Sequence, residues 1–405
     1  MQPPATIAPI TDVRDGIRHL SLRFYLPSLL ATTGTMMLVP TLPLYLAEQT
    51  ESLTLATLVL AAAAVGGVVG NLPSGALVQR VGERAGFIAG LALNAAGTLA
   101  LALTEGLWLP FVACFFAGIG QSCRLLARQA YARRAIATSI RGRLMSLYGG
   151  LGRVALLVGP LVGGFLGESI GFRPTFAVAA GVVTAGLVAA LLAGRGTASR
   201  PPPTPGSASQ GMLAVARRHG RVILLTGLGQ LGASLVRVGR LTVIPLYGAA
   251  IGLDLSDVGV VVAIAGGLDL LLFPVAGWLM DTVGRLYAIV PSFVFMAAGL
   301  AALPLANSFW GLAVAALLVG FGNGIGSGTM LTLSTDLAPA DNPAEFLGLV
   351  RLLADFGRIL GPLAVGIVAD RVSLGGSALV LAAVAIATAA LFLFAIGEPA
   401  KLAVD

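Results

Sequence analysis

Charged side chains occur inside long apolar segments of this sequence. In such segments an arginine can bind an anionic ligand and an aspartate can carry a proton. Seven arginines and two aspartates lie within such segments or close to their ends: Arg124, Arg128, Arg153, Arg237, Arg240, Arg351, Arg358, Asp269 and Asp355. A charge at the centre of a membrane costs about 2.5–3.5 kcal/mol on insertion scales, so each is a candidate functional residue. Because guanidinium groups bind carboxylate, phosphate and sulfate through paired hydrogen bonds, the excess of bases favours an anionic ligand.

The arginines nearest the middle of their segments are the candidates for substrate binding. Arg153 lies near the centre of one segment, and Arg237 and Arg240 share one helical face past the centre of another. We expect these three side chains to line a binding cavity. Arg124 and Arg358 are further substrate-binding candidates.

The two aspartates are the candidates for proton coupling. Asp269 has no charged partner on its own segment, and burial then favours its protonated form; an ion pair with an arginine of another helix is the alternative. Asp355 lies four residues after Arg351 and three before Arg358, which puts all three on one helical face. For Asp355 the alternative is a neutralised, structural cluster.

The sequence contains no pattern typical of a metal site, a disulfide or a nucleotide-binding loop. His19 and His219 are the two histidines and both flank apolar segments. Cys114 and Cys123 stand nine positions apart in one segment, about 13 Å along a helix, which is too far for a disulfide. No glycine-rich phosphate loop with a following lysine is present. We therefore expect neither enzymatic activity nor a cofactor, a metal or a nucleic-acid partner.

The composition requires a membrane protein built from helices. Of 405 residues, 57% are apolar and 11% are charged, against about 45–50% and about 25% in soluble domains. Because a helix needs about 20 apolar residues to cross a bilayer, we expect twelve spans. Their predicted ranges are 24–47, 55–78, 85–104, 107–127, 143–167, 174–193, 222–247, 257–280, 286–306, 309–335, 345–369 and 375–396.

The two halves of the sequence match each other at a constant offset of 202 residues. Pro43-Leu44-Tyr45 falls on Pro245-Leu246-Tyr247, and Gly159-Pro160-Leu161 falls on Gly361-Pro362-Leu363. With six spans in each half, such a parallel repeat is typical of a transporter made of two bundles. We expect an N-terminal bundle over 1–193, a cytoplasmic linker over 194–221 and a C-terminal bundle over 222–405.

Basic residues indicate how the chain is oriented. With the N-terminus inside, sixteen Arg or Lys residues fall on the cytoplasmic side, and only Arg173 and Arg371 fall outside. Lys and Arg gather on the cytoplasmic side of membrane proteins, so both termini are predicted to be cytoplasmic, in the inner membrane. The expected partners are a small-molecule substrate, protons and the bilayer, with the chain acting as a monomer.

The loops after the second and eighth spans resemble the Gly-x-Leu-x-Asp-x-x-Gly-Arg signature of the major facilitator superfamily. The candidate residues there are Gly75, Gln79, Arg80 and Gly82 in the first copy, with Gln79 where the aspartate belongs, and Gly277, Asp281, Gly284 and Arg285 in the second. The resemblance implies that Asp281 helps to latch the outward-facing state by binding a helix N-terminus or an arginine. We also expect the glycines to allow tight turns and close helix approach.

A second resemblance lies in the fifth span. Gly159, Pro160, Gly163 and Gly164 are similar to the Gly-Pro-x-x-Gly-Gly core found in antiporter branches of the same superfamily. This implies a bend or a tight contact on which gating depends; plain tight packing is the alternative. Cys114 stands where efflux members often carry an arginine for proton transfer.

Together these features predict a secondary active transporter of the major facilitator fold, resembling the proton-coupled efflux branch. It would move a small organic or amphipathic molecule by alternating access, by proton-coupled export, with a preference for anions. The alternatives are an importer, exchanger or uniporter of organic anions and, as a different class, a membrane receptor that does not transport.

Overall fold

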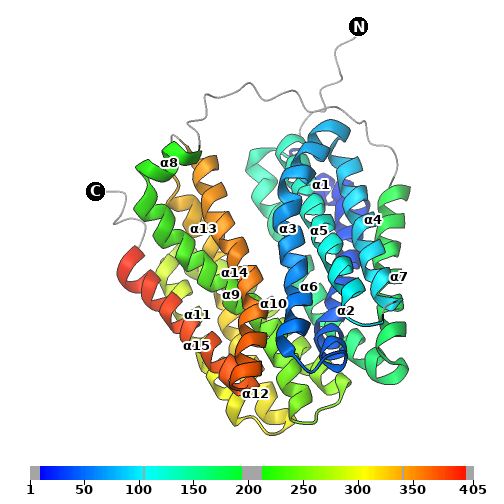
Figure 1. Cartoon of the computed structure of the whole chain (residues 1–405). Helices are drawn as coiled ribbons and strands as arrows, with labels where there is room; N and C mark the ends of the chain where they lie inside the picture. Colours follow the sequence, from blue (N-terminus) through cyan, green and yellow to red (C-terminus); the bar gives the residue numbers. More distant parts are fainter. Residues whose placement is uncertain (1–9, 104, 194–211, 340–341, 398–405) are drawn as a thin grey trace. The chain divides into compact units, whose positions relative to one another are not determined.

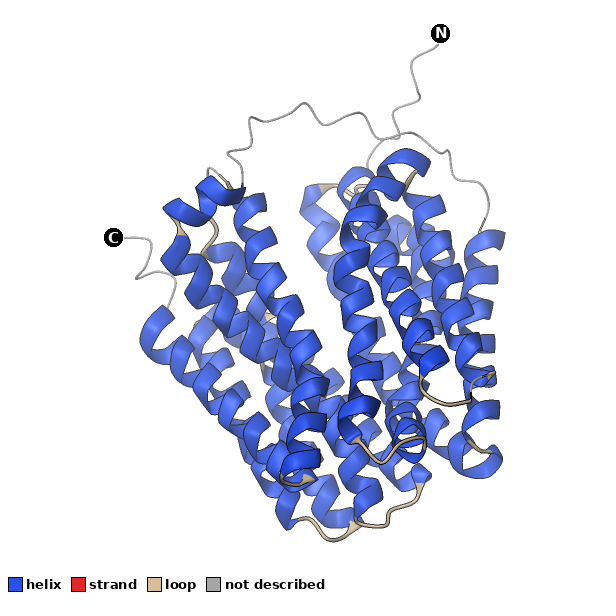
Figure 2. Ribbon diagram, viewed as in Figure 1, coloured by secondary structure: helices blue, strands red, loops and turns tan. Residues whose placement is uncertain are grey.

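The described part of the chain is helical. The computed structural model describes residues 10–103, 105–193, 212–339 and 342–397, and helices dominate these ranges (Figures 1 and 2). Within them the only extended pairing is an isolated parallel bridge between Ile10 and Ile136. The predicted all-helical fold class is confirmed.

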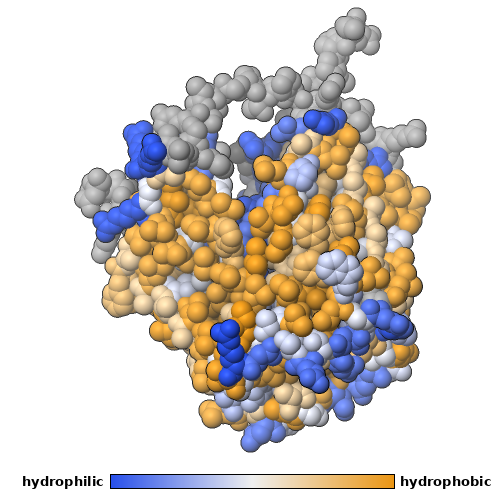
Figure 3. All heavy atoms as spheres, viewed as in Figure 1, coloured by the Kyte–Doolittle hydropathy of each residue, from blue (hydrophilic) through white to orange (hydrophobic). Residues whose placement is uncertain are grey.

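Twelve helical segments of the described chain are long and apolar enough to cross a membrane, as predicted. Many large apolar side chains on them are exposed, among them Leu72 at 86% and Phe394 at 83%. On the face drawn in Figure 3, hydrophobic residues cover the helices and hydrophilic residues gather toward their ends. Lipid along the helices and water at their ends account for this pattern.

The helices of the first half are α1 (Val13–Leu20), η1 (Ser21–Tyr25), α2 (Leu26–Glu48), α3 (Leu53–Val81), α4 (Glu83–Ala102), α5 (Trp108–Ala135), α6 (Thr138–Ile170) and α7 (Phe172–Leu192). The helices of the second half are α8 (Met212–Arg218), α9 (Gly220–Ala250), α10 (Leu255–Thr282), α11 (Arg285–Ala302), η2 (Leu303–Leu305), α12 (Phe309–Ile325), α13 (Thr329–Asp336), α14 (Pro343–Arg371), α15 (Leu374–Ala390) and η3 (Leu391–Ile396).

The chain forms two compact units that differ from a simple division at the linker. The first unit contains Met1–Thr41 and Ala62–Thr204, and the second contains Leu42–Ala61 and Pro205–Asp405. The start of α3 belongs to the second unit because Asp370 of α14 caps it: the carboxylate accepts hydrogen bonds from the backbone N–H groups of Leu53 at 2.8 Å and Thr54 at 3.0 Å. The predicted boundaries place that segment with the N-terminal bundle.

The tenth span is broken, although the sequence predicts one helix over 309–335. α12 ends at Ile325 and α13 begins at Thr329, with Gly326, Ser327 and Gly328 between them. Gly328 has a φ of +82°, a left-handed conformation that glycine adopts without a steric penalty. Three small residues with low helix propensity thus permit a break inside the span.

Two further boundaries differ from the predicted ranges. The first helical segment begins at Val13 rather than near residue 24, because Asp12 caps it by accepting the backbone N–H of Arg14 at 2.7 Å. The predicted linker over 194–221 includes the helix α8 and the start of α9. Residues 194–211 of that linker lie outside the described residues.

The glycines of the fifth-span motif are sites of close helix packing. A Cβ on Gly159 would lie 2.5 Å from Cβ of Met36, and one on Gly163 would lie 2.1 Å from the carbonyl oxygen of Met37, both on α2. Pro160 lies within α6, and Gly164 is buried. The motif therefore brings the backbones of α2 and α6 together, an arrangement that any larger residue at 159 or 163 would prevent.

The repeat carries the same packing into the second unit. A Cβ on Gly361 would lie 2.7 Å from the carbonyl oxygen of Leu235, and one on Gly357 would lie 2.1 Å from that of Leu231. These contacts join α14 to α9. The two halves thus share close helix packing at equivalent glycines as well as the sequence repeat.

Candidate functional site

Asp269 is buried on α10 and faces the broken tenth span. The residue is 4% exposed, and its carboxylate accepts hydrogen bonds from Nδ2 of Asn323 and Oγ of Ser327, both at 2.9 Å. Gly324 makes this approach possible, since a Cβ there would lie 3.2 Å from Cα of Asp269. Two neutral donors, one from α12 and one from the break, therefore hold the carboxylate.

The break itself is stabilised by side chains. Its carbonyl oxygen at Gly326 accepts hydrogen bonds from Nη2 of Arg237 at 2.8 Å and from Oγ1 of Thr329 at 2.7 Å. The Arg237 guanidinium also lies 5.8 Å from the centre of the Phe293 ring. A helix end inside a membrane needs such partners, because no bulk water is there to satisfy its carbonyl groups. Arg237 thus supports the backbone of the break.

Arg240 places a positive charge next to Asp269. It is 4% exposed, and its buried Nε atom has no hydrogen-bond partner among the described residues. Its charge interacts electrostatically with that of Asp269. Asp269, Arg237 and Arg240, which the sequence singles out separately, thus come together around one break in the second unit.

Asp355 on α14 is paired. It is 7% exposed, and its Oδ1 atom lies 3.5 Å from Nη1 of Arg358. Of the two bases that the helical spacing allows, Arg358 is the one that forms the ion pair. The pair joins two residues of the same helix, three positions apart.

In the first unit, arginines gather around a tyrosine. The guanidinium of Arg128 lies over the ring of Tyr148, 3.6 Å from its centre, and Arg124 lies four positions before Arg128 on α5. Among the described residues, no carboxylate forms an ion pair with Arg124 or Arg128. Arg153 donates to the carbonyl oxygen of Gly149 on its own helix at 3.1 Å. Arg124 and Arg128 of α5 therefore carry positive charge without a paired acid among the described residues.

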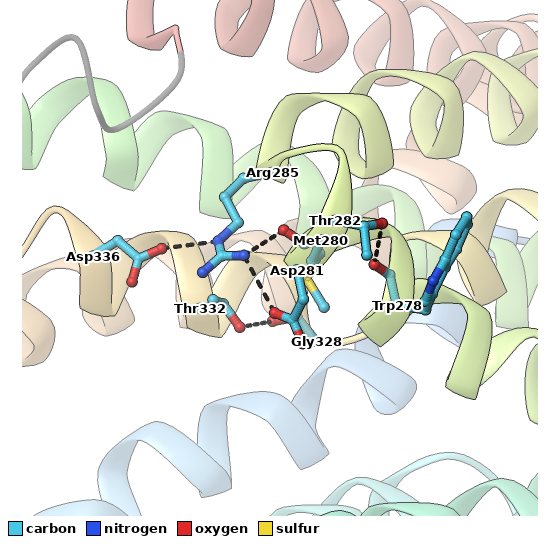
Figure 4. Close-up of polar contacts among 8 residues, drawn as sticks. All are labelled: Trp278, Met280, Asp281, Thr282, Arg285, Gly328, Thr332 and Asp336. Carbon is cyan, nitrogen blue, oxygen red and sulfur yellow. Dashed lines mark hydrogen bonds and ion pairs between the residues drawn. The ribbon is translucent and has the colours of Figure 1, made fainter.

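The second signature copy forms a charge bridge, which Figure 4 shows. Nε of Arg285 lies 3.0 Å from Oδ2 of Asp336, and Nη1 lies 3.5 Å from Oδ1 of Asp281. Nη1 also donates to the carbonyl oxygen of Met280. The arginine that Asp281 contacts is therefore Arg285 of the same motif, and the bridge connects the end of α10 to the end of α13.

The first copy carries the same bridge with its charges reversed. Oε2 of Glu83 lies 3.1 Å from Nη2 of Arg134. At the offset of 202 residues, Glu83 corresponds to Arg285 and Arg134 corresponds to Asp336. Gln79 and Arg80 of the first copy are exposed. The missing carboxylate at position 79 is thus accompanied by an acid at 83.

The signature glycines divide into two kinds. Gly82 and Gly284 have φ angles of +90° and +133° at the starts of α4 and α11, where only glycine turns without strain. Around Gly75 and Gly277, in contrast, an added Cβ would meet nothing within 4 Å. The close helix approach expected at Gly75 and Gly277 is therefore absent from the described structure, because both glycines face open space.

The sequence analysis missed Asn323 and Ser327, the partners of Asp269. They are uncharged, so a charge inside an apolar segment does not single them out. The available signal is the run Gly320-Phe321-Gly322-Asn323-Gly324-Ile325-Gly326-Ser327-Gly328, in which two polar residues stand four positions apart among glycines. Among the described residues, no cluster of three or more His, Cys, Asp or Glu side chains is placed to hold a metal ion.

Known proteins resemble this chain in sequence and in fold. Residues 25–362 and 226–404 match the family model of the Major Facilitator Superfamily. Multidrug resistance protein MdtH of Cronobacter sakazakii is 27% identical over 71% of this chain and 70% of its own length. Multidrug resistance protein MdtG of Dickeya zeae is 30% identical over 41% of each chain.

Solved structures share the fold at low sequence identity. A D-xylose–proton symporter superposes with a TM-score of 0.74 at 17% identity, covering 95% of this chain and 98% of its own. A POT family transporter in complex with a thioalcohol-conjugated peptide gives 0.73 at 16% identity, covering 92% and 94%. With twelve spans, the internal repeat and the family match, the chain belongs to the Major Facilitator Superfamily and is a membrane transporter rather than an enzyme.

Proposed function

We propose that this transporter exports small organic or amphipathic molecules by alternating access in exchange for protons, with a preference for anions. The observation that carries the proposal is Asp269, a buried carboxylate that accepts hydrogen bonds from Asn323 and Ser327 and lies near the charge of Arg240. The hydroxyl group of Ser327 can accept a hydrogen bond as well as donate one, so the site can hold Asp269 with or without a proton, as a proton carrier requires. The multidrug resistance names of MdtH and MdtG support the direction of export.

The preference for anions rests on the arginines. Arg124 and Arg128 have no paired carboxylate among the described residues, and Arg240 is buried beside a single aspartate. A desolvated guanidinium without a full counter-charge attracts carboxylate, phosphate or sulfate groups. Arg153 and Arg358 remain proposed cavity residues of lesser weight, since each already bonds within its own helix.

One observation favours the importer as a second candidate. Because the charge of Arg240 acts on Asp269, protonation of Asp269 would leave Arg240 without its counter-charge and ready for an anion. A proton and an anion that bind together at this pair would travel together, which is symport. Binding of the anion at Arg124 and Arg128 imposes no such linkage and is compatible with exchange against protons.

The deciding experiment measures the direction of proton movement in proteoliposomes with an internal pH dye. Organic anions, cations and neutral lipophiles are added outside, one at a time, without an imposed gradient. Exchange against protons makes the lumen alkaline as the substrate enters, whereas symport makes it acidic. Protein-free liposomes control for passive entry of weak acids.

The variant Asp269→Asn tests the proton site in the same assay. We expect it to lower the initial rate of substrate-linked proton movement at least tenfold, because an amide carries no titrating proton. Unchanged proton movement in this variant would remove Asp269 from the proposal. Exchange of labelled anions without any dye signal in the wild type would indicate an exchanger or uniporter, and binding without flux would indicate a receptor.

We further propose that the protein lies in the cytoplasmic membrane with both termini inside and works as a monomer. The excess of Arg and Lys in the loops assigned to the cytoplasm supports this orientation. Of those residues, Arg195, Arg200 and Lys401 lie outside the described residues.

A further inference from the structure

The hydroxyl group of Ser327 has one proton and two acceptors. Its Oγ atom lies 2.9 Å from Oδ1 of Asp269 and 3.1 Å from the carbonyl oxygen of Asn323, four residues earlier in the chain. A serine hydroxyl donates a single hydrogen bond but accepts others. Which acceptor receives the proton is therefore decided by the state of the carboxyl group.

The two protonation states of Asp269 require opposite orientations of this hydroxyl. An ionised carboxylate is only an acceptor, so Ser327 donates to Asp269 and the carbonyl of Asn323 loses the bond. A protonated Asp269 donates from Oδ1 to Oγ of Ser327, which then donates its own proton to Asn323. The second state satisfies every group of the chain Asp269–Ser327–Asn323.

The carbonyl of Asn323 matters because it belongs to the end of α12. In a continuous helix its partner would be the backbone N–H of Ser327, but that N–H bonds to the carbonyl of Gly324 at 3.1 Å. The Ser327 hydroxyl is thus the group that caps this carbonyl, and a helix end in a membrane loses stability when a carbonyl goes unsatisfied.

We infer that Ser327 is a positioning residue that couples protonation of Asp269 to the break between α12 and α13. Proton uptake by Asp269 turns the hydroxyl toward Asn323 and secures the end of α12; proton release turns it back and loosens that end. One proton arrives at or leaves Asp269, and Ser327 keeps its own throughout. The inference rests on the proposed role of Asp269 as the proton site.

The charged groups around Asp269 do not supply the pH dependence themselves. On α9, Arg240 acts on Asp269 and Arg237 binds the carbonyl of Gly326, and arginine stays protonated in proteins. At the ends of α10, α11 and α13, Asp281, Arg285 and Asp336 bind one another. The remaining titratable or charged side chains described on the elements packed against α10, and on α10 itself, are Arg221, Tyr247, Asp257 and Tyr287.

Hydrogen–deuterium exchange of a peptide that spans 320–336 tests the coupling in lipid nanodiscs. Rates at several pH values are divided by the intrinsic rates of the same sequence. In the wild type we expect protection at acidic pH to exceed that at alkaline pH about fivefold, the factor for one net hydrogen bond. Asp269→Asn should stay protected at every pH, because its amide N–H donates to Ser327.

Removal of the hydroxyl separates the coupling from the proton site. Ser327→Ala should show weak protection at every pH, Ser327→Cys should show a reduced response because a thiol is a weak donor, and Ser327→Thr should restore the response. The matched control is Ser334→Ala on α13. Ser334 is also buried and also donates to the carbonyl four residues earlier, Met330, at 2.8 Å, and its loss should leave the pH response intact.

The outcomes distinguish the two proposals. If Ser327→Ala shows the same pH response as the wild type, the coupling through Ser327 is wrong. If the alanine variant does not fold, the same result in Ser327→Cys overturns the coupling. If, in that case, Asp269→Asn has lost both the pH response of exchange and the proton movement, Asp269 remains the proposed proton site and only the coupling through Ser327 is rejected. If Asp269→Asn keeps both, the proposed proton site itself is wrong.

Discussion

At the scale of single residues, the second unit combines one acid with two bases that have different tasks. Arg237 donates to the carbonyl of Gly326 and so supports the backbone, whereas the charge of Arg240 acts on Asp269. Two arginines three positions apart on one helix, which the sequence treats alike, are therefore separated by their contacts. Arg240 is the better candidate for contact with a substrate.

Arg240→Gln should weaken anion binding while leaving the fold in place. A hydrogen bond to a charged group contributes about 1.5–3 kcal/mol, so the dissociation constant for an organic anion should rise about 10- to 100-fold. Equilibrium binding of the anions found in the flux assay measures this effect. The control is Arg358→Gln, which removes an arginine already paired with Asp355; equal losses in the two variants would contradict a special role for Arg240.

At the scale of elements, the internal repeat preserves geometry more faithfully than it preserves charge. Gly159 and Gly361, at equivalent positions, bring α6 against α2 and α14 against α9. The bridge between Glu83 and Arg134 occupies the positions of Arg285 and Asp336 with the charges exchanged. A bridge needs opposite charges at a fixed separation, and either order of the two satisfies that need.

Glycine positions give a matched test of close packing. Gly163→Ala should lower the free energy of unfolding by about 1–3 kcal/mol, because the new Cβ would lie 2.1 Å from the carbonyl oxygen of Met37. Gly75→Ala should leave stability unchanged or raise it by up to about 1 kcal/mol, since nothing lies within 4 Å and alanine favours the helix. Unfolding in detergent compares them, and equal stability of the two variants would contradict the packing role of the fifth-span motif.

At the scale of the whole molecule, orientation follows from the distribution of charge. Arg and Lys concentrate in alternate loops, and the two native cysteines, Cys114 and Cys123, are buried. The buried thiols keep background labelling low, so a single introduced cysteine reports which side of the membrane its loop faces.

Cysteine labelling in intact cells should confirm cytoplasmic termini. Asn307→Cys, exposed between η2 and α12, should react with a membrane-impermeant thiol reagent added outside. Arg217→Cys, exposed on α8, should react only in inverted vesicles. The reverse pattern would place the termini outside and contradict the orientation drawn from the charges.

Much of this architecture was predictable from the sequence because the bilayer imposes simple rules. Twelve spans follow from apolar segments of sufficient length, and the two-fold repeat follows from landmarks such as Gly159 and Gly361 at a constant offset. Close packing at Gly159 and Gly163 was also foreseeable, since small residues in a span have few other uses. Such rules depend on composition and spacing alone.

The sequence by itself thus determined the family, the number of spans and the residues worth testing, whereas the tertiary structure decided their partners. Asp269 meets Asn323 on α12 and Ser327 at the break of the tenth span, and Asp355 pairs with Arg358 rather than with Arg351. Hydrogen bonds and ion pairs depend on directions and on distances of a few tenths of an ångström between residues far apart in the chain. Periodicity fixes a residue's face on its own helix, but the group opposite that face is set by how the helices pack.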